Sequence, residues 1–201
     1  MQLASRRTKK QSSGQTEPDD QSRTLKFQEL FQGNPNAYGS DTGSAIWSPV
    51  STETFYNHLL GLVPIGIYPI VHSPTNMLQV RWGCCDIDTG DWSEAFMLAT
   101  ALRGMGLKPH VERSRSKGWH IWVFVDDPVS AMEMRRCLKV AYAAIDLPAK
   151  EANPKQENLG ANQLGNYVRL PYKGGLIVAS DRQTMMVNWS KHDDGRCAPF
   201  R

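Results

Sequence analysis

The sequence lacks the cysteine and histidine patterns of several common metal sites. Its four cysteines are Cys84, Cys85, Cys137 and Cys197, and none of them forms a CxxC pair. This spacing excludes a zinc knuckle and a disulfide framework, and it is typical of free thiols in a reducing cytosol. No HxH pair occurs either. Its absence argues against a replication-initiator nuclease, which needs a metal-binding histidine pair.

Long apolar stretches are also absent. The longest run, LLGLVPIGIYPIV, is broken by proline and glycine and is too short to span a bilayer. The N-terminus lacks the apolar segment of a signal peptide. We therefore expect a soluble, cytoplasmic protein with no membrane partner.

Neither sign of charge is in large excess. The 201 residues include 23 Lys and Arg against 20 Asp and Glu, a net charge of +3, and 40% are hydrophobic. This composition permits a polyanionic partner without requiring one, and it suffices for one domain with a hydrophobic core.

The N-terminal segment differs from the rest of the chain. Residues 1–25 are poor in apolar side chains, so we predict a disordered tail there. Its RRTKK cluster could contact a nucleic-acid backbone or simply keep the chain soluble. One folded domain is expected over residues 26–201. The ending CAPFR has no strong cap and is consistent with a fragment of a longer protein.

Helix and strand patterns alternate along the predicted domain. Capping residues and apolar spacing predict helices over 51–61, 93–106 and 127–145, the last beginning at an Asp-Pro pair. Strand patterns cover 65–71, 76–88, 108–114, 119–126 and 166–172. From Gln79 onward the order is strand, helix, strand, strand, helix, strand. This order predicts an α+β fold with an RRM-like (ferredoxin-like βαββαβ) sheet and an additional N-terminal α/β part.

Polar residues are expected to meet on one face of that sheet. Its first and third strands lie side by side, and successive side chains alternate between the faces. If the aliphatic residues pack on the two helices, Asp86, Asp88 and His120 share the open face. Two carboxylates one pleat apart can bind Mg²⁺ or Mn²⁺, which prefer oxygen ligands. Each feature also has an ordinary interpretation: a DxD can be a solvated strand end, Thr89 or Asp91 can cap a helix, and a strand histidine can be structural.

A basic, hydroxyl-rich turn, SRSKG, directly precedes the strand that carries His120. Five Lys or Arg and one acid, Glu112, lie between Arg103 and Lys117. Backbone amides around Gly118 and the side chains of the turn could hold a triphosphate, and His120 could reach the same phosphates. The predicted nucleotide-binding residues here are Ser114, Arg115, Ser116, Lys117 and His120.

These residues together resemble the archaeo-eukaryotic primase superfamily. Its pattern is a DxD strand, a serine-to-histidine turn and strand, and a later third acid on an RRM-like sheet. Further motifs are similar to those of primase-polymerases from phages, mobile elements and CRISPR-associated systems: GIYP at 66–69, ERSRS at 112–116 with H-W-F at 120–124, and GN-x-x-x-LP at 165–171. The turn SRSKGWH also resembles SGSKGLH in the polymerase domain of bacterial end-joining ligases. The likeness covers residues 50–190.

The resemblance implies a DNA-templated primase-polymerase that adds NTP or dNTP to a 3′-hydroxyl by two-metal catalysis. Asp86 and Asp88 would ligate Mg²⁺ or Mn²⁺, and Arg169 or Arg182 would add charge at the triphosphate. The implied partners are a single-stranded DNA template and a helicase or C-terminal accessory primase domain. The implied location is the cytoplasm of a bacterium or a phage-infected host.

One position departs from the family pattern. The third acid normally ends a late β segment such as VFVDW, whereas the matching segment here is MMVNW, with Asn188 in the acid's place. Asparagine offers one neutral carbonyl oxygen, so a metal site loses a charge there. Three interpretations are open: two carboxylates suffice, Asn188 is an introduced substitution, or Asp181 supplies the third ligand. The predicted catalytic residues are Asp86, Asp88 and Asn188, in an enzyme that the asparagine could impair.

The rival interpretation is a catalytically inactive RRM-like nucleic-acid-binding domain. Such a domain would read RNA through Trp122 and Phe124 on an open sheet. The motif K/R-G-F/Y-G/A-F-V is absent, however, and two central carboxylates would repel a phosphate backbone. Trp119, Trp122 and Tyr172 are candidates for base stacking and equally for core packing.

Overall fold

The computed structural model of the chain describes residues 18–114, 117–160, 162–175 and 186–187. Its helices are α1 (Pro18–Phe31), α2 (Thr52–Leu59), α3 (Trp92–Gly104) and α4 (Ala131–Ala143). Its strands are β1 (Ala37–Ser40), β2 (Ala45–Trp47), β3 (Ile65–Ile67), β4 (Val71–His72), β5 (Leu78–Ile87), β6 (Pro109–Arg113), β7 (Trp119–Ser130), β8 (Ala152–Asn153), β9 (Val168–Arg169) and β10 (Met186–Val187). None of the helices within these ranges is long and apolar enough to cross a membrane.

The larger of two sheets has the ferredoxin-like topology that the sequence predicts. Its strands follow the order β10-β6-β7-β5-β4, and β8 pairs with β5. Strand β7 lies antiparallel between β5 and β6, and β8 is antiparallel to β5. With α3 after β5 and α4 after β7, the chain therefore forms a βαββαβ unit, and the α+β prediction is confirmed.

The fourth strand of this unit is not the predicted one. The sequence pattern favoured 166–172, but Val168–Arg169 (β9) pairs with β3 in the second sheet. The strand that completes the unit is Ala152–Asn153 (β8), whose residues face Cys85 and Cys84 of β5. Two residues without a β-branched or aromatic side chain carry no strand pattern.

The additional N-terminal part is a 4-stranded sheet with the order β2-β1-β3-β9. Gly39 and Gly66 are Cα partners on β1 and β3. A Cβ on either glycine would lie 2.4 Å or 2.2 Å from ring atoms of Tyr167, so the glycines leave the space that this ring fills. The Tyr167 hydroxyl also donates to the Ser40 carbonyl at 3.0 Å. The GIYP and GN-x-x-x-LP motifs are thus joined by direct packing.

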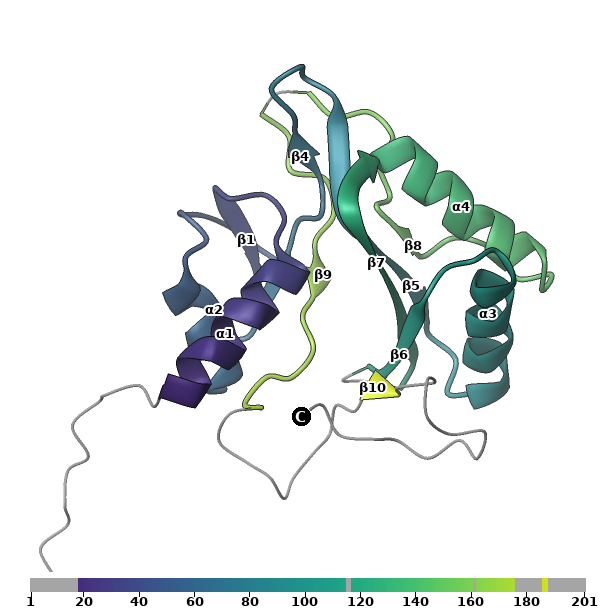
Figure 1. Ribbon diagram of the computed structural model, residues 1–201, viewed down its shortest axis with the longest axis horizontal. Coiled ribbons are helices and arrows are strands. Elements are labelled where there is room, and N and C mark those ends of the chain that lie inside the picture. Colours follow the sequence, from purple (N-terminus) through teal and green to yellow (C-terminus); the bar gives the residue numbers. More distant parts are fainter. Residues whose placement is uncertain (1–17, 115–116, 161, 176–185, 188–201) are drawn as a thin grey trace, which may run out of the picture.

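Each face of the large sheet has a hydrophobic core. In Figure 1, α3 and α4 lie on one side of this sheet, and α1 and α2 lie on the other. On one face, Ile121 and Val123 pack beneath α3 and α4. On the other, Trp82 and Trp122 pack against α1, α2 and the small sheet. The face that the sequence predicted to be open is therefore covered at its centre, because α1 contributes Phe31, which is fully buried.

Two predicted element boundaries are wrong. Helix α1 begins at Pro18, so residues 18–25 are helical and do not belong to a disordered tail. Helix α4 begins at Ala131, and the Asp-Pro pair predicted to open it belongs to β7. Residues 125–128 lie where the β5–β7 register shifts between Val80 and Trp82. An irregularity of this kind accommodates proline, which has no amide hydrogen for the ladder.

Helix α2 is fixed by a buried histidine. Its start has the predicted cap, since Ser51 and Thr54 form a reciprocal capping box. Near its end, His58 Nδ1 accepts a hydrogen bond from the Ile65 amide at 3.2 Å. The Nε2 atom therefore carries the hydrogen and donates it to the Pro171 carbonyl at 2.7 Å. His58 thus links α2, β3 and the segment after β9.

Candidate active site

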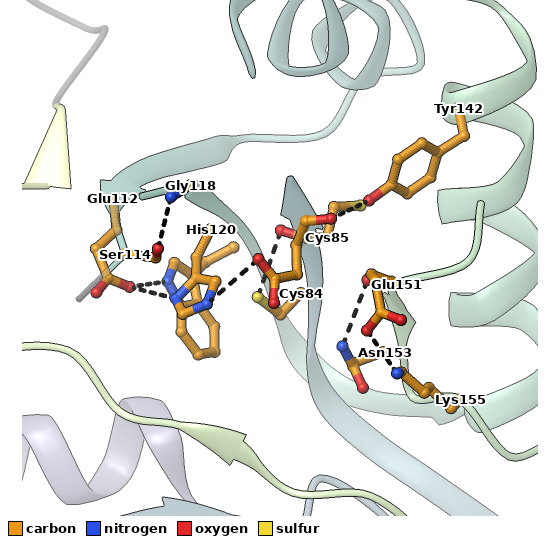
Figure 2. A network of polar contacts seen from close by, with 12 residues as sticks. Cys84, Cys85, Glu112, Ser114, Gly118, His120, Tyr142, Glu151, Asn153 and Lys155 are labelled. Carbon is orange, nitrogen blue, oxygen red and sulfur yellow. Dashed lines mark hydrogen bonds and ion pairs between the residues drawn. The ribbon is translucent and has the colours of Figure 1, made fainter. Parts of the chain in front are cut away.

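The candidate site is a row of three polar residues across neighbouring strands. Asp86 on β5 is the Cα partner of His120 on β7, and His120 is the partner of Glu112 on β6. His120 Nδ1 lies 3.2 Å from Glu112 Oε2, and Nε2 lies 3.7 Å from Asp86 Oδ1. Figure 2 shows the ring of His120 with Glu112 beside it. The structure therefore brings Asp86 and His120 together, as expected, and adds a second carboxylate.

Glu112 is the residue that the sequence analysis did not select. It is 3% exposed, and its Oε2 atom accepts a hydrogen bond from Trp122 Nε1 at 2.7 Å. In the segment KPHVERS, a charged residue at an alternating position is typical of a solvated strand face. Glu112 could have been selected because its strand was expected beside the strand of His120. That position identifies it as a neighbour of His120 only when the strand register is known.

The two carboxylates dominate the electrostatics of His120. Burial by itself lowers the pKa of the imidazole. The contacts with Asp86 at 3.7 Å and with Glu112 at 3.2 Å, together with the negative charges of both carboxylates, outweigh burial and raise the pKa to about 10. At neutral pH the ring is therefore an imidazolium ion between two carboxylates.

The backbone of Asp86 is held on both sides. Its amide donates to the Glu151 carbonyl at 3.0 Å, and its carbonyl accepts from the Tyr142 hydroxyl of α4 at 3.1 Å. Its side chain keeps 29% of its surface exposed. Asp88 follows the last residue of β5 and is exposed. One carboxylate thus projects from a fixed strand and the other from the loop beyond it.

The SRSKG turn packs against that same end of β5. A Cβ on Gly118 would lie 1.9 Å from the Ile87 carbonyl oxygen and 3.0 Å from Asp88 Cα, so only glycine fits this approach. A Cβ on Gly90 would lie 3.6 Å from the Lys117 carbonyl oxygen. The turn and the loop that carries Asp88 are therefore neighbours, and Lys117 is exposed beside them.

Two hydrogen bonds between Ser114 and Gly118 join the ends of the turn. The Ser114 amide donates to the Gly118 carbonyl at 2.9 Å, and the Gly118 amide donates to Ser114 Oγ at 3.0 Å. Figure 2 shows this second bond close to Glu112 and His120. The Gly118 amide was expected to be available for phosphate, but Ser114 occupies it. Ser114 is only 8% exposed.

The remaining predicted site residues fall into two groups. Arg169 lies on β9 of the small sheet, and its Nη2 atom donates to the Asp41 carbonyl at 3.1 Å. The others lie outside the described residues: Arg115, Ser116, Asp181, Arg182 and Asn188. The late β segment predicted before Asn188 is present as Met186–Val187, which pairs with β6 opposite Glu112 and Val111. The segment thus runs along the strand that carries Glu112.

All three candidate stacking aromatics pack against the hydrophobic cores, Trp122 fully buried and Trp119 and Tyr172 half-buried. Trp122 is fully buried, which contradicts the expectation of an exposed aromatic on an open sheet. The Phe27 ring meets Tyr172 edge-on, with centroids 6.3 Å apart. Trp119 packs on Trp92 at 4.8 Å, and the Arg113 guanidinium lies 4.7 Å from the Trp119 ring centroid. An RRM-like binder that reads bases through Trp122 does not fit this arrangement.

The carboxylates fit a hard divalent cation. Asp86 and Asp88 offer partly exposed oxygen atoms at one end of the sheet, a donor set that suits Mg²⁺ or Mn²⁺. Asp91 is not available, because its side chain accepts from the Ser93 amide at 2.8 Å and caps α3. Within the part of the chain that the structure describes, no three His, Cys, Asp or Glu side chains form a metal-sized cluster. A two-carboxylate site is the arrangement that these residues offer.

The chain is similar to solved structures and to one family model. Two solved structures are similar: the AEP domain of the cyanophage S-2L primase-polymerase, at 16% identity over 76% of this chain and 83% of that chain with a TM-score of 0.47, and the polymerase domain of Mycobacterium tuberculosis Ligase D in complex with DNA, at 20% identity over 68% and 57% with a TM-score of 0.39. A comparison with curated proteins finds no match. The family model of the TOTE conflict system archaeo-eukaryotic primase domain matches residues 14–193. Because that match spans most of the sequence, the chain belongs to the archaeo-eukaryotic primase domain family of TOTE conflict systems.

Proposed function

We propose that this chain is a DNA-templated primase-polymerase that transfers nucleotides from NTP or dNTP to a 3′-hydroxyl on single-stranded DNA. Its relatives are nucleotidyltransferases of the primase-polymerase type. The observation that carries the proposal is the contact between the SRSKG turn and the end of β5. Gly118, at the end of this turn, lies against the Ile87 carbonyl and Asp88 Cα, which supports the binding of a triphosphate near Asp86 and Asp88.

Each part of the site has a distinct task in this reaction. Asp86 and Asp88 would hold the divalent cations, Mg²⁺ or Mn²⁺, which when bound activate the attacking hydroxyl and stabilise the leaving pyrophosphate. Lys117 and the imidazolium of His120 would bind the triphosphate as cationic hydrogen-bond donors. Arg115, Ser116 and either Arg169 or Arg182 would add to this binding, and Ser114 would shape the turn.

Asn188 would set the rate of the reaction. If the third ligand position carries an amide, the cations are bound by two carboxylates and one neutral oxygen. We expect the substitution Asn188→Asp to raise nucleotide incorporation by restoring the missing charge. An unchanged rate would favour Asp181 or a two-carboxylate site.

The test is a gel assay for nucleotide incorporation on single-stranded DNA with Mn²⁺, run with and without a primer. Asp86→Asn should abolish product, because the amide loses the charge that binds the cation. Asp91→Asn is the matched control: it removes a carboxylate from the loop that follows β5, while asparagine caps α3 as well as aspartate does. Product without a primer would establish priming, and product only with a primer would establish extension.

Three outcomes would contradict the proposal or part of it. Equal activity of wild-type protein and Asp86→Asn would remove Asp86 from the site. Loss of product in both aspartate variants would indicate a general charge effect. No product from wild type and from Asn188→Asp, with template binding intact, would favour a catalytically inactive nucleic-acid-binding domain. A helicase or accessory primase domain as partner would be tested by adding that component to the same assay.

A further inference from the structure

Glu112 is a buried carboxylate that the proposed reaction does not use. It is 3% exposed and lies on β6, at the end of the row that runs from Asp86 on β5 through His120 on β7 to Glu112. Burying a charged group is unfavourable unless hydrogen bonds compensate for it. A pair of apolar residues at Glu112 and His120 would pack in the sheet at a similar or lower free energy. Stability by itself therefore gives no reason for the carboxylate.

The position of Glu112 is fixed from the core. Its Oε2 atom accepts from Trp122 Nε1 at 2.7 Å. The Trp122 ring is in turn held edge-on by Trp82 at 5.4 Å and by Phe31 of α1 at 5.1 Å between centroids. The Glu112 carboxylate is thus hydrogen-bonded to the Trp122 side chain, which is packed tightly in the core. Helix α1 contributes to this packing through Phe31.

The same oxygen atom determines the orientation of His120. A carboxylate can only accept, so the Nδ1 atom of His120, 3.2 Å away, must carry a hydrogen. The Nε2 atom then lies on the opposite side of the ring, 3.7 Å from Asp86 Oδ1. Without the bond to Glu112, the ring could turn about its χ2 angle and direct either nitrogen away from the end of β5.

We propose that Glu112 is a positioning residue that fixes the rotamer of His120, so that Nε2 faces the end of β5 where nucleotide is bound. This inference rests on the proposed function for its consequence in catalysis. Its structural part, the control of the His120 ring by Glu112, does not depend on that function. Trp122 contributes to this positioning because its Nε1 atom donates a hydrogen bond to the Glu112 carboxylate.

The first experiment reads the imidazole ring directly, without a substrate. The ¹⁵N and ¹H signals of the His120 ring are compared by NMR in wild type, Glu112→Gln and Glu112→Leu. The carbonyl oxygen of glutamine can accept the same two hydrogen bonds, so its ring signals should show Nδ1–H as in wild type. Leucine has no acceptor, so the Nδ1–H signal should shift or be lost. Identical ring signals in wild type and Glu112→Leu would overturn the proposal.

A second variant keeps the proposal testable if the Glu112→Leu protein does not fold. Trp122→Phe keeps an aromatic ring in the core but removes the bond that holds Glu112. It should move the His120 ring signals in the same direction as Glu112→Leu and by less. Ring signals that stay at their wild-type positions in Trp122→Phe would mean that Trp122 does not hold the carboxylate.

The second experiment measures whether Glu112 acts through His120. Glu112→Leu should raise the nucleotide KM by about 10- to 100-fold, as loss of a residue that orients a ligand typically does. Template affinity should stay the same, and Glu112→Gln should remain near wild type. In a His120→Leu background, adding Glu112→Leu should cause no further loss. A full additional loss there would show that Glu112 acts on the sheet as a whole and would overturn the proposal.

The two experiments separate the inference from the function on which it rests. A wild-type chain that incorporates no nucleotide would count against the proposed function alone, because the ring signals still decide the role of Glu112. If the ring signals change but the nucleotide KM does not, Glu112 orients the His120 ring, and the proposed effect of that orientation on nucleotide binding is refuted.

Discussion

Acid should destabilise this protein through His58, a residue far from the candidate site in sequence. His58 is 1% exposed, and burial lowers its pKa to about 4 from an ordinary value of 6.5. The bond from Nε2 to the Pro171 carbonyl opposes this effect but does not cancel it. The folded protein therefore keeps His58 neutral over a pH range in which the unfolded chain protonates it.

The size and sign of the effect follow from these two pKa values. Between pH 6.5 and about 4 the unfolded state binds one more proton at His58, so the free energy of unfolding rises with pH. The stabilisation is fully present above pH 6.5 and is lost as the pH falls through the folded pKa of about 4. Each pKa unit corresponds to about 1.4 kcal/mol, so the loss is about 3 kcal/mol. A typical domain has a total stability of about 5–15 kcal/mol.

Urea unfolding at a series of pH values measures this loss. The control is His58→Gln, whose amide offers one acceptor and one donor but does not titrate. Every other group is common to both proteins, including His120 with its raised pKa, so the difference between the two curves isolates His58. The wild-type curve should fall about 3 kcal/mol further than the variant curve between pH 7 and pH 4. Parallel curves would refute the assignment of a neutral, buried His58.

Two further changes test the support of the site. Gly118→Ala should lower stability by about 1–3 kcal/mol and raise the nucleotide KM, because its Cβ would overlap the Ile87 carbonyl. A melting temperature and a KM equal to those of wild type would show that the turn does not pack there. Tyr142→Phe should cost about 1 kcal/mol in urea unfolding, because the Asp86 carbonyl loses its hydroxyl donor. An unchanged unfolding midpoint would contradict the importance of that bond.

The sequence predicts the parts of the fold that rest on strong periodic patterns. Strand β7, with its aromatic and β-branched residues, begins at the expected residue, Trp119, and helix α3 lies within two residues of its expected bounds. The sequence also predicts that Asp86 and His120 share one side of the sheet, because side-chain alternation on neighbouring strands determines the face. These inferences need only the local pattern and a known topology.

The failed predictions have a common physical cause, which is long-range packing. Residues 19–24 are all polar, and the segment is helical because Phe27 and Phe31 further along α1 dock on the sheet. Strand β8 is two residues long and is specified by its partner β5. Glu112 looked solvated because the local sequence cannot show that Trp122 and His120 face it. Tertiary contacts supply the information in each case.

The backbone hydrogen bonds of Asp86 imply that its backbone is more rigid than that of Asp88. With its amide and carbonyl both engaged, the Asp86 peptide should be among the slowest of the chain to exchange its hydrogen for deuterium. The Asp88 amide, past the end of β5, should exchange far sooner. In the proposed reaction Asp86 would then hold cations from a fixed position, and Asp88 would be free to adjust its position to them.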